Sequence, residues 1–347
     1  MRILHVGSYA PNATPRFRAA AMRRIGHTVV DLDIDPLLGS PSRLAGALRI
    51  RLLMGPAISA VNRAVLAAAR REPFDLIWFD KPVWIRSATV TALRATGAVV
   101  VSYMPDNPYG PRGDPGWRLF LAAVPRYSVH VLVNPAGAPH YRTAGAPHVF
   151  VMPVPYEPTV HYPPPDGWSD ADRDIGVGFV GSPYGRRADF LRALWRRHGV
   201  VVRVMGEPGM WRRAFDAEEM ARFHAGSAVY NDDYRAIIWR TRINLGFVTH
   251  ANLDSYAQRW FEIAGSAGFL LADRTDEGLA SFADGREAAF FRGVDECAAA
   301  IRRYLPDAAA RETIARAGHA RAVASGYDND SRLRALFEKI AAACPRS

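Results

Sequence analysis

The residues best suited to chemistry lie between Asp254 and Leu279. This segment reads as a short polar loop, a helical turn that carries Arg259 and Glu262, a small-residue bend over 265–268 and a buried strand. A carboxylate at a helix start can bind ribose hydroxyls, while the helix terminus and free backbone N–H groups can face phosphate. The segment therefore predicts a site for a phosphorylated, activated small molecule, and it points to an enzyme.

A glycine-rich turn over 176–187 is the second candidate phosphate site. Such a turn after a buried strand lets the backbone approach a phosphate closely, and Arg186 or Arg187 can add charge-assisted hydrogen bonds. The glycine spacing is not the dinucleotide fingerprint, because one glycine lies inside the strand. A tight turn without a ligand is the alternative. We assign Gly181, Ser182 and Arg186 to the same nucleotide site as the acidic helix.

The first half of the chain offers further polar residues at strand ends. Asp106 follows a strand in a proline-rich loop, where a carboxylate could act as general base on a hydroxyl, although Pro-Asp-Asn-Pro is also strong turn chemistry. Asp80 and Lys81 follow another strand, and a salt bridge between them is the simpler interpretation. His5 reads as a core histidine. The loop after the first strand offers three further contacts: Ser8, Tyr9 and Asn12.

Strands alternate with helices along the chain, which predicts parallel βαβ units in open, doubly wound sheets. We expect strands at 3–7, 27–34, 76–79, 98–103, 129–133, 175–180, 200–205, 241–248 and 269–272. We expect helices at 17–25, 43–71, 87–95, 117–123, 188–197 and 230–239, and mostly helix from about 294 onward.

The prolines between 153 and 165 interrupt this alternation and predict an interdomain linker. We expect a first domain over 1–160, a second domain over 170–325 and a final helix over 326–347 that packs back on the first domain. Ligands in such sheets bind beyond the carboxyl ends of the strands. The predicted fold class is α/β, with two Rossmann-like domains facing an interdomain cleft.

Composition narrows the class of protein. The 347 residues are 49% hydrophobic and 22% charged, as in ordinary globular proteins. Two cysteines predict neither a disulfide framework nor a metal cage, and no run of about 20 apolar residues occurs. The net charge of +10 is carried almost entirely by arginine. The base composition of the organism could explain this excess of arginine, and the alternative is that the arginines bind anions. No sequence motif favours nucleic acid as the anion.

Several segments resemble glycosyltransferases of the GT-B fold, and most of all the group similar to the spore maturation protein CgeB. The segments that carry the resemblance are Phe179–Ser182, Arg259–Leu271, Leu279–Phe282, Asp75–Pro82 and Tyr103–Pro108. The resemblance covers most of the chain and is strongest from about 175 to 335. It implies a sugar nucleotide in the second domain, with UDP favoured, and an acceptor in the first.

The resemblance also implies roles for individual residues. Glu262 matches the acid that binds the donor ribose, and Arg259 and Arg186 are the expected partners of the diphosphate. Tyr256 is grouped with them on the donor side. Asp254 falls where retaining enzymes carry a glutamate that contacts the sugar, although aspartate is one methylene shorter.

Asp254 and Asp106 are therefore the two catalytic candidates, and they imply different stereochemical outcomes. Asp254 favours retention of the sugar's configuration, whereas Asp106 as base implies inversion, and both outcomes stay open. No Asp-x-Asp triplet occurs at a plausible metal position, and Asp31–Asp33 lies in an N-terminal strand. We therefore expect a metal-independent reaction without a cofactor.

Two other functions fit the same architecture: a nucleotide-sugar epimerase, and a non-catalytic protein that binds nucleotide sugar. We expect a cytoplasmic location. The arginine-rich stretch from Leu44 to Arg71 could form a basic amphipathic helix at an anionic inner membrane face, which would suit a lipid-linked acceptor. The alternative is a helix pair packed on the first sheet with its arginines outward.

Overall fold

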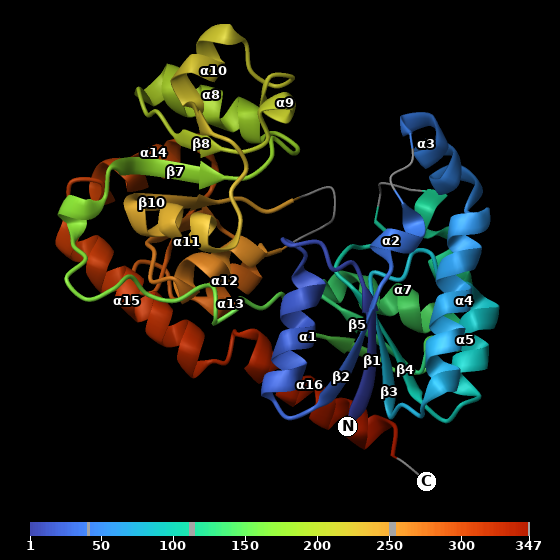
Figure 1. The fold of residues 1–347 in the computed structure, drawn as a ribbon. Coiled ribbons are helices and arrows are strands. Elements are labelled where there is room, and N and C mark those ends of the chain that lie inside the picture. Colours follow the sequence, from blue (N-terminus) through green and yellow to red (C-terminus); the bar gives the residue numbers. More distant parts are fainter. Residues whose placement is uncertain (40–41, 111–114, 250–254, 346–347) are drawn as a thin grey trace. The chain divides into compact units, whose positions relative to one another are not determined.

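A computed structural model describes residues 1–39, 42–110, 115–249 and 255–345. The chain divides into two compact units. Unit 1 comprises Met1–Pro153 together with Asn329–Ser347, and unit 2 comprises Val154–Asp328. The last helix, α16 (Asn329–Ala343), is therefore part of the N-terminal unit. Each unit is a parallel six-stranded sheet with helices on both faces (Figure 1).

The sheet of unit 1 has the strand order β2-β1-β3-β4-β5-β6. Its strands are β1 (Arg2–Gly7), β2 (Thr28–Asp33), β3 (Leu76–Asp80), β4 (Val99–Met104), β5 (Val129–Leu132) and β6 (Val149–Val151). Its helices besides α16 are α1 (Thr14–Arg24), α2 (Asp35–Leu38), α3 (Arg43–Leu52), α4 (Pro56–Arg71), α5 (Ser87–Arg94), α6 (Arg118–Ala123) and α7 (Ala138–Thr143), with short 3-10 turns at Pro115–Trp117, Val124–Arg126 and Pro135–Gly137.

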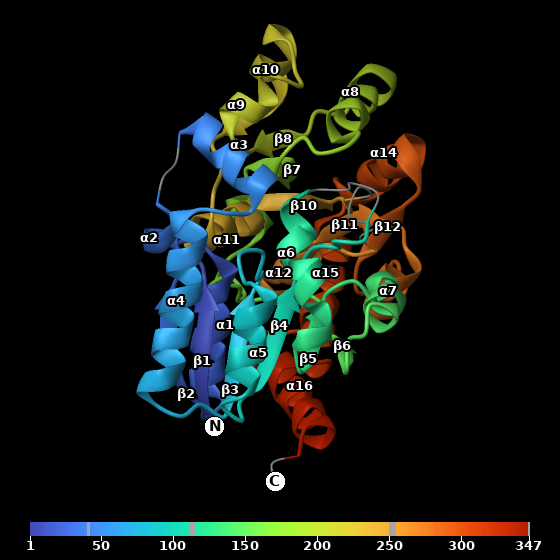
Figure 2. The same ribbon diagram turned by 90° about the vertical axis from the view of Figure 1, so that its right-hand side faces the viewer.

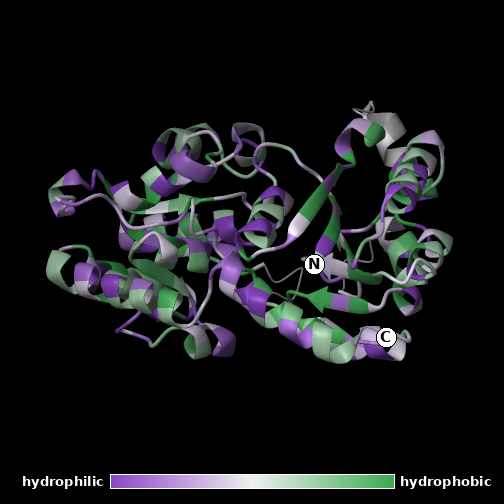
Figure 3. Ribbon diagram, turned by 60° about the horizontal axis from the view of Figure 1, so that its bottom comes forward, coloured by the Kyte–Doolittle hydropathy of each residue, from purple (hydrophilic) through white to green (hydrophobic). Residues whose placement is uncertain are grey.

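Helices cover both faces of this sheet. Helix α1 packs beside α16, while α4 packs against α2 and α5, and α5 against α6 (Figures 1 and 2). The central strands read as continuous apolar runs because both of their faces are buried. Leu76–Asp80, for example, is buried at every position. Colouring by hydropathy shows apolar strands at the centre of each unit and helices with mixed faces (Figure 3).

Unit 2 has the strand order β9-β8-β7-β10-β11-β12. Its strands are β7 (Ile175–Val180), β8 (Arg203–Met205), β9 (His224–Gly226), β10 (Thr241–Gly246), β11 (Leu270–Asp273) and β12 (Ala289–Phe291). Its helices are α8 (Arg187–His198), α9 (Pro208–Trp211), α10 (Ala217–Phe223), α11 (Asn231–Arg240), α12 (Gln258–Gly265), α13 (Asp276–Ser281), α14 (Gly293–Tyr304) and α15 (Ala308–Ala324), with a 3-10 turn at Asp170–Asp172.

Both strand orders reverse direction once, and they confirm the expected doubly wound architecture. In unit 1 the reversal lies between β1 and β3, and in unit 2 it lies between β7 and β10. At such a switch point the two neighbouring loops leave in opposite directions and open a crevice at the carboxyl ends of the strands. The fold therefore provides one candidate ligand crevice in each unit.

The helical stretch expected over 43–71 is two helices. The break lies at Leu53–Gly55, where Leu53 and Gly55 have φ angles of 52° and 113°. Both angles are incompatible with a continuing helix, and Pro56 then starts α4 because proline fits the first helical position. The short strands β6, β9 and β12 were not expected either, since three residues carry too little periodicity to be recognised.

The proline-rich segment expected as a linker packs on unit 2 over much of its length. Tyr156, Val160 and His161 are buried. Prolines keep the chain extended and leave its carbonyl groups unpaired, so side chains of α11 can bind them. Arg235 donates to the Val160 carbonyl at 2.7 Å, and Trp239 Nε1 donates to the Tyr162 carbonyl at 3.0 Å. These contacts bring His161 next to α12.

None of the helices in the described ranges is both long enough and apolar enough to span a bilayer.

Candidate functional site

The switch point of unit 2 brings two helix N-termini to the carboxyl ends of β7 and β10. Helix α8 begins at Arg187 after β7, and α12 begins at Gln258 in the connection that follows β10. Neither helix has a side-chain cap, whereas α10 is capped by Asp216 and α13 by Thr275. First-turn N–H groups without a cap, at the positive end of the helix dipole, form a favourable environment for an anion.

Glycine at the β7–α8 turn permits close packing. The N–H of Gly181 donates to the Met205 carbonyl at 2.9 Å, and its carbonyl accepts from Trp211 Nε1 at 2.9 Å. A Cβ at this position would lie 2.7 Å from the ring of Phe179. Gly181 therefore shapes the turn, and its own N–H is not available to a phosphate.

The two adjacent arginines of this turn have different surroundings. Arg187 donates to the Ser182 carbonyl at 3.1 Å and to Thr249 Oγ1 at 3.1 Å, so it ties the loop after β7 to the loop after β10. Arg186 is exposed, and no described residue bonds its side chain. Arg186 is thus the guanidinium with freedom to reach a ligand. The exposed ring of Tyr184 lies in the same turn.

Helix α12 presents Arg259 and Glu262 three residues apart, on one face. The Arg259 guanidinium lies 4.9 Å from the ring centre of Tyr234 on α11. Burial lowers the pKa of Arg259, but Tyr234 and Glu262 outweigh this effect and raise it. Arg259 therefore stays a cation, held beside the carboxylate of Glu262.

Among the residues that the structure describes, the contacts of Glu262 involve one of its two oxygens. Oε1 accepts from Gln258 Nε2 at 2.9 Å and lies 4.0 Å from Nε2 of His161. No described residue bonds Oε2, and the side chain keeps 12% of its surface exposed. The carboxylate is thus oriented through one oxygen and can accept hydrogen bonds from a ligand through the other.

His161 is a residue of this site that the sequence analysis missed. Its Nδ1 accepts the N–H of Glu157 at 3.3 Å, so the proton of the neutral ring is on Nε2, which faces Glu262. Burial lowers the pKa of His161, while Glu262 raises it less strongly. The ring is therefore neutral and turns its Nε2 proton toward the carboxylate, 4.0 Å away. No sequence signal connects the proline-rich segment with α12, because only the fold brings them together.

Two expectations about the opening segment change. Glu262 lies in the middle of α12 rather than at its start. The bend at 265–268 ends the helix, and its N–H groups bond to the carbonyls of residues 262–264, so they are not free for phosphate. Tyr256 is 8% exposed and packs edge-on against Phe261 at 5.9 Å. Asp254 lies outside the described residues.

At the carboxyl edge of the unit 1 sheet, Asp106 follows β4 and Lys81 follows β3. Their side chains form an ion pair, with Lys81 Nζ 2.6 Å from Asp106 Oδ2. The expected Asp80–Lys81 pair is therefore wrong. Oδ2 is covered by Lys81, and 37% of the Asp106 side chain is exposed. Oδ1 is the oxygen that can meet a substrate.

Asp80 instead anchors a buried network beneath the β1–β3 switch point. Its Oδ1 accepts from Arg18 Nη1 at 2.5 Å, and its Oδ2 lies 3.0 Å from His5 Nε2. His5 Nδ1 lies 2.5 Å from the hydroxyl of Tyr9, which is half-buried at the sheet edge. Burial raises the pKa of Asp80, but the Arg18 charge and the His5 hydrogen bond outweigh burial, so that the pKa is lowered overall. His5 is a core residue, as expected, and it fixes Tyr9 in the crevice.

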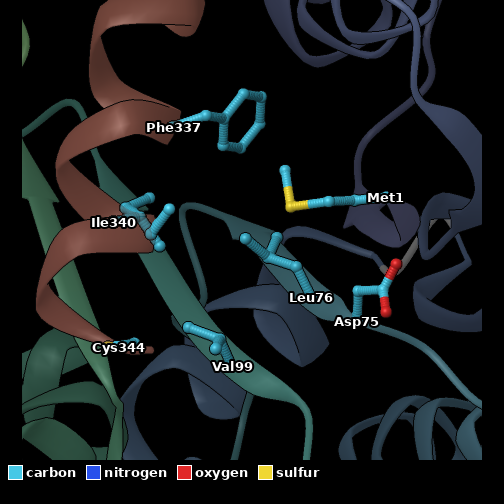
Figure 4. Close-up of a pocket in the computed structure, with 8 residues that line it drawn as sticks. Met1, Asp75, Leu76, Val99, Phe337, Ile340 and Cys344 are labelled. Carbon is cyan, nitrogen blue, oxygen red and sulfur yellow. The ribbon is translucent and has the colours of Figure 1, made fainter. Parts of the chain in front are cut away.

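Another concavity of unit 1 lies away from the β1–β3 switch point. A cavity of about 310 Å³ opens at the amino-terminal edge of the sheet, between the ends of β3 and β4 and helix α16 (Figure 4). Its lining is mostly apolar and includes Met1, Leu76, Val99, Phe337 and Ile340. Within the described ranges, no group of three or more His, Cys, Asp or Glu side chains could hold a metal ion.

Comparison with known proteins agrees with this geometry. Residues 186–338 match the model of a family described as glycosyl transferase-like. The chain is a glycosyltransferase with the GT-B fold. The matched region begins at the β7–α8 turn, and it includes α12 and most of α16. A sequence search of curated proteins found no significant match.

Solved glycosyltransferases share the fold at low sequence identity. Sucrose-phosphate synthase from Thermosynechococcus elongatus superposes with a TM-score of 0.68 at 12% identity, covering 99% of this chain and all of that one. Anabaena HepE in complex with UDP-glucose gives 0.66 at 14% identity, with 99% and 100% coverage. A glycosyltransferase from Rickettsia africae gives 0.67 at 12% identity, with 100% and 99% coverage.

Proposed function

We propose that this glycosyltransferase transfers a sugar from a UDP-sugar to an acceptor hydroxyl and releases UDP. The observation that carries the proposal is Glu262, whose Oε1 is held by Gln258 while Oε2 is left to a ligand. A carboxylate oriented in this way, beside the cation of Arg259, suits a ribose next to a diphosphate. The complexes of HepE with UDP and with UDP-glucose support UDP as the nucleotide. The finer likeness to the CgeB group is part of this proposal.

Positive charge from the protein would stabilise the leaving diphosphate. Arg186 and Arg259, together with the uncapped N-termini of α8 and α12, place cationic groups and N–H donors at the switch point. Preorganised charge of this kind can take the role that a metal ion has in other transferases. We therefore propose a metal-independent reaction that needs no cofactor.

The acceptor would bind unit 1, near the β1–β3 switch point. Tyr9 and Asp106 lie at this edge of the sheet, and Asp106 Oδ1 is the oxygen able to accept a hydroxyl proton. An acid in this role implies inversion at the sugar. Asp254 as the sugar contact, in contrast, would favour retention.

An epimerase is the second candidate function. Its chemistry needs several acids or histidines around the sugar, and His161 adds one imidazole to the donor site. The ring is neutral and its Nε2 proton faces Glu262, so we expect it to orient that carboxylate rather than to move protons on the sugar. A non-catalytic protein that binds sugar nucleotides would show neither reaction.

Donor hydrolysis separates the three functions. The protein is incubated with UDP-glucose and other UDP-sugars, and nucleotide and sugar products are resolved by chromatography. A transferase slowly releases UDP with water as acceptor, an epimerase interconverts the sugars, and a binding protein does neither. Glu262→Ala should abolish UDP release, while Glu312→Ala on exposed α15 should retain it. Interconversion without UDP release would overturn the proposal.

A further inference from the structure

Apolar side chains are exposed where α3 ends. Ile50, Leu52 and Met54 expose 43%, 52% and 69% of their surfaces. Eight large hydrophobic residues are exposed in the described part of the chain, and three of them lie in these five positions. Single exposed apolar residues are common on protein surfaces, but a cluster of this kind marks an interaction site. We refer to residues 49–54 as the α3 tip.

The sequence stretch that contains the α3 tip is strongly basic. Residues 36–71 contain six arginines and no aspartate or glutamate. Arg49 is half-buried, and Arg51 is exposed between the apolar side chains. Arg63 is exposed on α4. A partner must therefore combine negative charge with an apolar interior.

The fold holds the α3 tip at one edge of unit 1. Helix α3 follows β2 and α2 and precedes α4, so it lies at the carboxyl edge of the sheet, the edge that also carries Tyr9 and Asp106 (Figures 1 and 2). Leu53 is buried, and Arg118 donates to the carbonyl of Arg51. The tip is thus anchored from one side while its apolar residues point to solvent.

We propose that the α3 tip docks on an anionic lipid bilayer. Apolar side chains can enter the boundary between headgroups and acyl chains, while Arg49 and Arg51 extend to the lipid phosphates. The charge pattern favours lipid over a protein partner, because every charged residue of the stretch has the same sign. Docking at this edge implies an acceptor hydroxyl carried at the membrane, and that step rests on the proposed function.

Vesicle co-sedimentation of the full chain tests the docking. Vesicles of phosphatidylcholine are compared with vesicles that also contain phosphatidylglycerol. The wild-type protein should sediment with the anionic vesicles, and ~0.5 M NaCl should weaken this binding. The pairs Leu52→Glu with Met54→Glu, and Arg49→Glu with Arg51→Glu, should each lower the partition coefficient on the order of tenfold or more.

A matched control changes an exposed surface of unit 2. Arg316→Glu with Val323→Glu on α15 makes one charge reversal and one apolar-to-acid change, and it should bind vesicles like the wild type. Circular dichroism and UDP affinity should be unchanged in every variant, which shows that the fold and donor site persist. UDP binding is measured without vesicles, so failure of the donor proposal and failure of docking are distinguishable.

Two results would overturn the proposal. The first is that the wild-type protein does not sediment with anionic vesicles, or that the α3 variants bind them as well as the wild type does. The other is a dimer in sedimentation velocity that the Leu52→Glu, Met54→Glu pair dissociates, with no vesicle binding. That outcome would assign the α3 tip to a second copy of the chain.

Discussion

His161 Nε2 lies 4.0 Å from Glu262 Oε1, and the backbone N–H of Glu157 fixes the ring's tautomer so that its proton faces the carboxylate. The proline-rich segment thereby orients a side chain of α12. His161 belongs to the donor site as a positioning residue, because it acts through Glu262 and leaves the other carboxylate oxygen to the ligand.

Replacing His161 should weaken donor binding moderately. His161→Ala removes the imidazole whose Nε2 lies 4.0 Å from the Glu262 carboxylate, so we expect the loss of this polar contact to lower UDP affinity roughly threefold to tenfold in calorimetry. Because burial lowers the pKa of His161, the wild-type ring is neutral at pH 7 and becomes charged only in acid. His198→Ala, on an exposed helix end, should leave the affinity unchanged. An equal loss in both variants would contradict the positioning role.

Glu262 should determine recognition of the ribose. Glu262→Ala removes charge-assisted hydrogen bonds, for which we expect at least a tenfold loss of UDP affinity. The wild type should prefer UDP over 2′-deoxy-UDP, and the variant should lose this preference. Glu262→Gln, which keeps one acceptor oxygen, should be intermediate. A variant that still discriminates against the deoxy nucleotide would move the ribose site elsewhere.

Arg186 and Arg187 should respond differently to truncation. Arg186 is exposed and bonded by no described residue, so Arg186→Ala should weaken UDP binding about tenfold without changing the melting temperature. Arg187 ties two loops together, so Arg187→Ala should lower both affinity and melting temperature. Uridine lacks the diphosphate and serves as the control ligand. Its affinity should be unaffected by Arg186→Ala.

Asp80 should be essential for the stability of unit 1. Asp80→Ala leaves the buried Arg18 without a counter-ion, at a cost of about 3–5 kcal/mol. The exposed pair of Asp174 and Arg240 is the control, and its loss should cost less than about 1 kcal/mol. The pKa of Asp80 in the folded protein is below its ordinary value of 3.8. Its contribution to stability is therefore fully present above about pH 3.8, and it is lost as the pH falls through the pKa of the folded protein. Urea unfolding at pH 7 measures both variants.

His130 should make the protein less stable in mild acid. Its Nδ1 pairs with Ser102 at 2.6 Å and its Nε2 with the Val124 carbonyl at 2.8 Å, and burial lowers its pKa to about 4. The unfolded chain, in which His130 has a pKa near 6.5, then binds more protons than the folded protein between pH 4 and 6.5. The free energy of unfolding therefore decreases as the pH is lowered through this window. The expected loss from pH 7 to pH 5 is about 2 kcal/mol.

The measurement for His130 compares urea unfolding at pH 7 and pH 5 in the wild type and in His130→Gln. The variant is less stable at pH 7 because a buried site is altered, but its loss between the two pH values should be smaller by most of this amount. Equal losses in the two proteins would show that other groups cause the acid sensitivity.

Much of the fold follows from the alternation of apolar strands with helices. Buried strands such as Leu76–Asp80 are continuous apolar runs, so their number and parallel arrangement are legible from local pattern. The split of α3 from α4 was missed, because Leu53 adopts its left-handed angle only where the packed helices demand it. The pairing of Asp80 was missed because Arg18 and His5 are distant in sequence and meet only at the switch point.

The sequence by itself determined the two doubly wound units, the acid and the arginine of α12, and the basic, acid-free stretch before β3. These features are local in the chain, and composition and periodicity express them directly. Only the tertiary structure decided that His161 orients Glu262, that Arg187 ties two loops while Arg186 stays free to reach a ligand, and that Lys81 pairs with Asp106. These residues become neighbours through the order of the strands in each sheet, and no single segment of the sequence determines that order.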